Sequence, residues 1–98
     1  MGDISSISGI VRILEPPKTF TNSMTQFKAQ FPQIRSDFIV NLKCWGNLAH
    51  DVANYYDVND YILIEGYFSS HVSNTVPTLK IFNIVVLKIY PFRLKSLN

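Results

Sequence analysis

The stretch from residue 38 to residue 66 limits the possible folds more than any other part of the chain. It opens with an alternating segment in which every second residue is apolar, as in a strand with one buried face (Phe38, Val40, Leu42, Cys44). Apolar residues then recur at helical spacing (Leu48, Ala49, Val52, Ala53, Tyr56). A second alternating segment follows over Tyr61–Ser69. Because a lone amphipathic helix must bury its apolar stripe, this order predicts a β-structure with one helix packed on it.

Three further β-rich segments lie outside this stretch, at Ile4–Leu14, Met24–Phe31 and Leu79–Tyr90, and the last is long enough that we expect it to bend. Proline-containing or polar segments separate the strands (Glu15-Pro16-Pro17, Lys18–Ser23, Pro32–Asp37, Ser70–Thr75). Three strands, a short helix and two strands are the pattern of an all-β, five-stranded OB-fold Greek-key barrel, with one short α-helix between the third and fourth strands. We therefore predict one OB-fold domain over residues 1–92 and a short basic tail over residues 93–98.

Two asparagines are expected at the ends of these elements. Asn47 precedes the apolar helical stripe and is predicted to be the N-cap of the helix. Asn59 lies in the predicted turn Asp57–Asp60 and can adopt a left-handed backbone conformation, which asparagine tolerates better than most residues.

Composition excludes several classes of protein. The 98 residues suffice for one domain, and 47% hydrophobic residues can form a buried core. Cys44 is the only cysteine, so an internal disulfide is impossible, and we expect it to be a small buried residue. No apolar run approaches the ~20 residues that span a membrane, and the N-terminus lacks the pattern of a secretory signal. The net charge of +2 permits a polyanionic partner without requiring one.

The sequence also lacks the motifs of catalysis and metal binding. It has no Gly-rich phosphate loop and no nucleophilic serine elbow. His50 and Asp51 are adjacent in the predicted helix and so point in different directions. His50 and His71 have no third ligand at metal-binding spacing. We therefore expect neither an enzyme nor a protein that holds a metal, a cofactor or a small-molecule substrate.

Several motifs of the chain resemble the bacterial-type single-stranded-DNA-binding protein family, in the same order and at compatible spacings (Ser8-Gly9-Ile10-Val11, Glu15-Pro16-Pro17, Trp45-Gly46-Asn47-Leu48-Ala49, Ile64-Glu65-Gly66). The resemblance covers most of the chain and implies sequence-tolerant binding of single-stranded DNA, rather than RNA, in replication, repair or protection. The short length and the abundance of residues with AT-rich codons resemble homologues from algal plastids and cyanobacteria. The expected location is therefore a plastid stroma or a cyanobacterial cytoplasm.

The chain departs from the family pattern in three segments. The tail after Phe92 carries no acid, whereas family members often end in an acidic tip that recruits other proteins. The segment Tyr67–His71 contains no Arg or Lys, and Asp57–Asp60 stands where the family has a basic turn. From these departures we expect weak binding of DNA and no recruitment of other proteins through the tail.

A binding site for single strands needs aromatic surfaces for the bases and cations for the phosphates. Trp45 is the best stacking candidate, because the alternation places it on the outward set with Asn41 and Lys43; coverage by a loop or a partner subunit is the alternative. Lys28 and Arg12 face outward on neighbouring strands. Further candidates come from the first loop and the last two strands (Lys18, Phe20, Tyr67, Lys80).

The competing hypothesis is a protein-interaction module. The low net charge, the acidic turn and the missing cations after Gly66 favour it. In that case the outward apolar residues Ile10, Ile39 and Leu63 would form the interface. Under either hypothesis we expect a homo-oligomer, a dimer or a tetramer, because a small barrel leaves a strand edge to protect.

Overall fold

The computed structural model describes residues 6–21, 23–35, 37–76 and 79–92, and of these it leaves the side chains of residues 70–80 undescribed. The predicted tail over residues 93–98 therefore lies outside the described residues. The elements are the strands β1 (Ser6–Ile13), β2 (Lys18–Thr19), β3 (Met24–Gln30), β4 (Ile39–Trp45), β5 (Tyr61–Val76) and β6 (Leu79–Pro91), and the helix α1 (Gly46–Tyr55).

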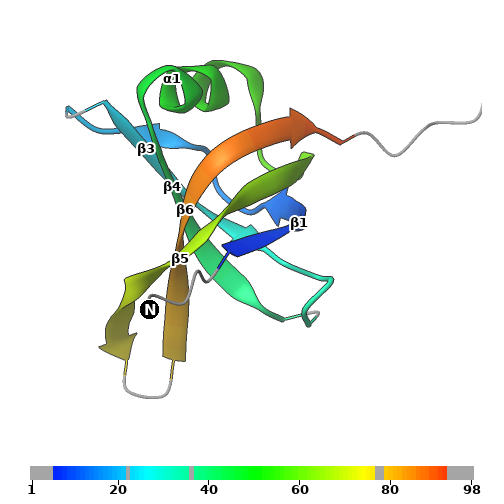
Figure 1. The fold of residues 1–98 in the computed structure, drawn as a ribbon, viewed down its shortest axis with the longest axis vertical. Coiled ribbons are helices and arrows are strands. Elements are labelled where there is room, and N and C mark those ends of the chain that lie inside the picture. The colour runs from blue at the N-terminus through cyan, green and yellow to red at the C-terminus, as the bar shows by residue number, and fades with distance from the viewer. Residues whose placement is uncertain (1–5, 22, 36, 77–78, 93–98) are drawn as a thin grey trace, which may run out of the picture.

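The strands form one sheet in the order β1-β5-β6-β4-β3-β2, and an additional pairing of β1 with β3 closes it into a barrel. The pairing of β4 with β6 is parallel, and the other pairings are antiparallel. Figure 1 shows α1 over one end of the barrel, while the β5–β6 hairpin extends beyond the other end. This arrangement confirms the predicted OB-fold with its helix between the third and fourth long strands. The two-residue strand β2 is additional to the five predicted strands and lies in the segment predicted to be a loop.

The predicted inward faces form the core. Every second residue of β1, β3, β4 and β5 is buried, and α1 adds Ala49 and Val52 (Val11, Ile13, Phe27, Ala29, Val40, Leu42, Cys44, Ile62, Ile64). Phe38 and Phe68 both contact the ring of Phe82 in β6, at centroid distances of 5.7 and 5.9 Å. Cys44 is fully buried, as expected, and burial raises the pKa of its thiol to about 11. The core is thus a single apolar cluster beneath α1.

Two further predictions about element boundaries are wrong. The residue at the N-cap of α1 is Trp45, not Asn47, and no side chain caps the helix. Gly46 has φ of 67° and its N–H donates to Ser23 O at 3.2 Å, so the left-handed glycine turns β4 directly into α1. The segment Ser70–Thr75 belongs to β5 rather than to a loop. Its polar sequence does not prevent this, because the ladder to β6 is made by backbone groups.

The turn before β5 is as predicted. Asn59 has φ of 75°, and Asp60 N–H donates to Asp57 O at 3.1 Å. The turn is attached to β1, because Asn59 N–H donates to Ile13 O at 2.7 Å and Ile13 N–H donates to Asp60 O at 2.9 Å. The bend expected in the last strand is present as register shifts between β5 and β6, the first of them at Glu65 and Gly66. No helix among the described residues is long and apolar enough to cross a membrane.

Gly66 lies at a close approach of β5 and β6. A Cβ atom at this position would collide with the carbonyl oxygen of Val85 and would lie 3.0 Å from Val86 Cα. Both obstacles are backbone atoms, which cannot rotate away as a side chain could. The glycine is therefore required for the pairing of β5 with β6 at the bend.

We predict that Gly66→Ala lowers the free energy of unfolding by about 2–3 kcal/mol, as overpacking against backbone does. Gly46→Ala is the matched control, because a Cβ there meets nothing within 4 Å and is opposed only by its φ of 67°. We expect the control to cost about 1 kcal/mol. Urea denaturation followed by circular dichroism measures both values. Equal losses for the two variants would contradict the steric argument at Gly66.

Candidate nucleic-acid interface

Three adjacent strands present a basic outer surface. We define the basic face as the outward residues of β2, β3 and β4 near α1 (Lys18, Met24, Gln26, Lys28, Lys43, Trp45). Lys18 lies opposite Gln26, and Gln26 lies opposite Lys43, so the three residues form one row across the sheet. With neighbouring strands about 4.8 Å apart, the backbones of the two lysines are separated by about 10 Å. The row is thus a pair of cations with an amide between them.

Trp45 lies one step from this row, at the end of β4 next to α1. It is opposite Met24, and 46% of its surface is exposed. Phe20 follows β2 on the other side of Met24, to whose carbonyl oxygen its N–H donates at 2.7 Å, and it is exposed to the same extent. Two aromatic rings at the edge of a basic surface are suited to stacking with bases.

Two threonines hold β2 and α1 in place behind these aromatic residues. The buried Thr25 hydroxyl donates to Ala49 O in α1 at 2.9 Å. Its oxygen also lies 3.1 Å from the Thr19 hydroxyl. Because Thr25 uses its single proton on Ala49, Thr19 must be the donor in the second bond. The first turn of α1, and with it Trp45, is therefore fixed relative to β2 and β3.

The three lysines of the basic face are available to a ligand. Lys18 and Lys28 are exposed and Lys43 is half-buried. Among the described residues the recorded ion pair is Arg35–Asp37, which lies in the connection between β3 and β4. Glu15 is the neighbouring acid, and its carboxylate accepts the backbone N–H of Lys28 at 3.2 Å. The basic face therefore has a net positive charge.

Asn41 is not exposed, contrary to the prediction. It is outward on β4 opposite Lys28, yet only 6% of its surface is accessible. The parallel pairing places Asn83 of β6 beside it, and Asn41 Nδ2 donates to Asn83 Oδ1 at 3.0 Å. Asn41 Oδ1 is buried without a hydrogen-bond partner among the described atoms. Asn41 therefore belongs to the join between β4 and β6 and is not accessible to a ligand.

Arg12 lies beyond the Lys28 end of the basic face, far from Trp45. It is opposite Gln30, six residues along β3 from Met24, which corresponds to about 20 Å of strand. Its Nε and Nη2 donate to Gln30 Oε1 at 3.1 and 2.9 Å, and its Nη1 donates to Asn59 Oδ1 at 2.7 Å. The structure thus does not bring Arg12 together with Trp45 and Lys43, and it engages the guanidinium within the protein.

The remaining candidates lie towards β5. Tyr67, 41% exposed, is opposite Val85, which is in turn opposite Lys43, so the row of the basic face continues to this tyrosine. Lys80 belongs to β6, but its side chain is outside the described part of the structure, as is that of His71. Gln26 and Met24 were not among the site residues predicted from the sequence. Only the outward alternation of β3 could have indicated Gln26, because a single amide carries no motif.

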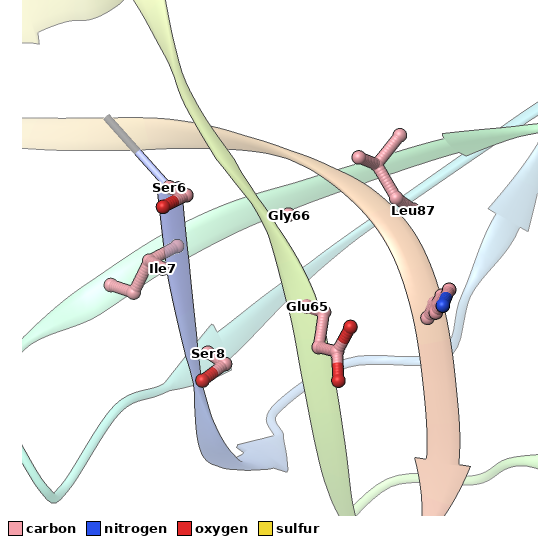
Figure 2. Close-up of a pocket in the computed structure, with 7 residues that line it drawn as sticks. Ser6, Ile7, Ser8, Glu65, Gly66 and Leu87 are labelled. Carbon is pink, nitrogen blue, oxygen red and sulfur yellow. The ribbon is translucent and has the colours of Figure 1, made fainter. Parts of the chain in front are cut away.

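A shallow cavity of about 400 Å³, with a mixed polar and apolar lining, lies on a different part of the barrel, over β1, β5 and β6. Figure 2 shows Ser6 and Ser8 on β1, Glu65 and Gly66 on β5, and Leu87 on β6 around it. Glu65 is opposite Lys88, so a carboxylate and an ammonium group occupy paired positions. No cluster of three metal-ligating side chains occurs among the described residues.

Comparison with known proteins yields one relative and a set of similar structures. No family model matches the sequence. A protein of Trieres chinensis named "Putative single-stranded DNA-binding protein ycf41" is 37% identical to this chain over an alignment of 103 positions, gaps included. The alignment covers 93% of this chain and 91% of the relative.

Solved structures with TM-scores of 0.70 to 0.73 have the same fold. The single-stranded-DNA-binding domain of a Synechococcus protein has a TM-score of 0.70 at 16% identity, covering 92% of this chain and 98% of that one. The mitochondrial protein Rim1 of S. cerevisiae has a TM-score of 0.73 at 13% identity, covering 96% and 100%. At such low identities these structures support the fold alone. The expectation that the chain is not an enzyme agrees with the relative's name.

Proposed function

The chain belongs to the single-stranded-DNA-binding protein family, and from this premise we propose that it binds single-stranded DNA on the basic face without sequence preference. The observation that carries the proposal is the half-exposed ring of Trp45 beside the row Lys18–Gln26–Lys43. It places a stacking surface next to two cations. Relatives named for DNA rather than RNA favour DNA as the ligand.

Stacking supplies the larger share of the binding energy in this proposal. Each stacked base contributes about 1–3 kcal/mol, and any base can stack because all have a flat π surface. Trp45 and Phe20 take bases at the edge near α1, and Tyr67 extends the platform across β6. The bound strand then has its bases covered, which prevents reannealing and limits nuclease attack.

The lysines hold the phosphates. With Lys18, Lys28 and Lys43 each contacting one phosphate and about 0.7 counterions released per contact, log Kd would change with log salt at a slope of about 2. Gln26 lies between the two lysines of the row and can donate to a base or a phosphate from its amide. Arg12 does not contact the DNA strand in this proposal. Its guanidinium is hydrogen-bonded to Asn59 and holds the turn before β5.

The cellular role follows from the same premise. We assign the protein to replication, repair or protection of DNA in a plastid stroma or a cyanobacterial cytoplasm. The support is the relative from Trieres chinensis, together with the fold shared with a Synechococcus domain.

We predict that Trp45→Ala weakens binding of labelled oligo-dT about 5- to 150-fold, the equivalent of one lost stacking interaction of about 1–3 kcal/mol. Fluorescence anisotropy of the labelled oligonucleotide measures the affinity, since the variant has no tryptophan of its own. Tyr55→Ala is the matched control, because it removes a more exposed aromatic ring, 74% accessible, at the other end of α1. The wild-type protein failing to bind at low salt would refute the proposal.

We also predict that Lys43→Gln and Lys18→Gln each reduce the salt slope by about 0.7, because each removes one phosphate contact. Lys88→Gln is the matched control, since Lys88 is an exposed lysine opposite Glu65, outside the basic face. The measurement is the affinity for oligo-dT at several salt concentrations. A slope that falls equally in all three variants would indicate a diffuse charge effect rather than this face.

A specific observation also favours self-association. Ile10 is opposite Leu63, and Leu63 is opposite Tyr90, so an apolar row crosses β1, β5 and β6 on the outer surface. Tyr90 is 43% exposed, and the other two are half-buried. Ile39 lies two strands away from this row, beyond Gln30 and Arg12. We propose that the row, rather than all three predicted apolar residues, forms the interface of a homo-oligomer.

Leu63→Gln is expected to convert this oligomer to a monomer, because it places an amide in the middle of the apolar row. Size-exclusion chromatography with light scattering measures the mass, and circular dichroism checks the fold. Val58→Gln, at a 38% exposed position in the turn before β5, should leave the mass unchanged. A wild-type protein that is monomeric at concentrations of about 100 μM would refute the interface.

A further inference from the structure

A cavity of about 410 Å³ lies at the C-terminal end of α1, where it is lined by four aromatic residues, one proline and one acid (Tyr55, Tyr56, Asp60, Tyr61, Pro91, Phe92). We call it the tyrosine cavity. Trp45 precedes the first residue of α1 and Tyr55 is its last, so about 15 Å of helix separates the tyrosine cavity from the basic face. We propose that the tyrosine cavity binds the guanidinium group of an arginine from a basic segment of a partner protein.

The aromatic lining is suited to a cation. Three tyrosines and a phenylalanine surround the cavity, and a cation close to the face of an aromatic ring is attracted by the ring's quadrupole. Tyr55 is 74% exposed, although an aromatic ring of this size gains by being covered. A planar guanidinium can stack on such a ring while its N–H groups remain directed at a carboxylate.

The charged residue among the described lining residues is an acid. Asp60 lines it, and no cation is among the described lining residues. The pKa of the Tyr56 hydroxyl is raised by burial and by the negative charges of Asp51 and Asp60. The last turn of α1 contains no basic residue, so the negative end of the helix dipole is not neutralised there.

Arg12 is the nearest strand cation, because it lies opposite Tyr61, but its guanidinium is bonded to Gln30 and Asn59. The Arg12 guanidinium is therefore not available to fill the tyrosine cavity, which we assign to an arginine of a partner protein.

The tyrosine cavity is held in shape by backbone hydrogen bonds. Tyr56 N–H donates to Val52 O at 3.3 Å, and Phe92 N–H donates to Tyr61 O at 3.2 Å. The Asp60 side chain accepts the N–H of Asp57 at 2.8 Å, and its main-chain carbonyl accepts that of Ile13. Because the walls are already positioned, little ordering is needed on binding.

The same features make nucleic acid a poor occupant. A phosphate would approach Asp60, with Asp51 and Asp57 close in the chain, and would find no described cation in the lining. The basic face offers the opposite combination, aromatic rings with lysines. The two surfaces therefore select ligands of opposite charge.

The experiment titrates acetyl-Gly-Arg-Gly-amide into the ¹⁵N-labelled protein and follows amide chemical shifts. The matched probe replaces arginine by citrulline, which keeps the shape and removes the charge. We expect saturable shifts confined to residues 55–61 and 91–92 with the arginine peptide. Asp60→Asn, which can still accept the Asp57 N–H, and Tyr55→Ala should each lower the affinity about tenfold.

Tyr67→Ala and Trp45→Ala are controls and should leave peptide binding unchanged, so failure of this proposal is distinguishable from failure of the proposed DNA binding. Equal binding of the citrulline peptide would overturn the proposal, since the cavity would then select shape rather than charge. Shifts of the same residues by oligo-dT would overturn it in favour of nucleic acid. So would the absence of any shift at millimolar concentrations of peptide.

Discussion

The close contact between β5 and β6 at Gly66 is the constraint on which the rest of the barrel depends. A residue without a side chain there lets Val85 approach, and the register shift beside it bends both strands. The bend allows β5 to pair with β1 on one side and with β6 on the other, and β6 to reach β4 in parallel. The barrel closes through these pairings, and closure decides which residues of each strand face outward.

The arrangement of outward residues follows from this closure rather than from any local motif. Lys18, Gln26 and Lys43 align because β2, β3 and β4 are neighbours in register. The same registers place Val85 and Tyr67 further along the row. In this chain the proposed ligand surface is thus arranged by strand register, and two threonine hydroxyls fix α1 beside its aromatic edge.

Much of the fold was predictable from the sequence, because alternation in Phe38–Cys44 and helical spacing from Leu48 to Tyr56 report directly on which side faces the core. The burial of Asn41 and the hydrogen bonds of Arg12 were not predictable. Alternation gave both an outward position correctly, but Asn41 is covered through the parallel contact with β6, and Arg12 is engaged by Gln30 and Asn59. Both outcomes depend on residues more than 17 positions away in sequence, which no local pattern records. The tyrosine cavity was not predictable either, since only the fold brings Pro91 and Phe92 to Tyr61.

Helix α1 has a consequence beyond closing one end of the barrel. Its first residue follows Trp45 and its last residue lines the tyrosine cavity, so the same ten residues carry a positive pole at one surface and a negative pole at the other. The helix is therefore a rigid spacer. The positive end of its dipole lies beside the surface proposed to bind DNA, and its negative end lies beside the cavity proposed to bind a cation. A strand held at Trp45 and a basic segment held at Tyr55 would not compete for the same atoms. A single small barrel could then keep two oppositely charged polymers side by side without allowing them to neutralise each other.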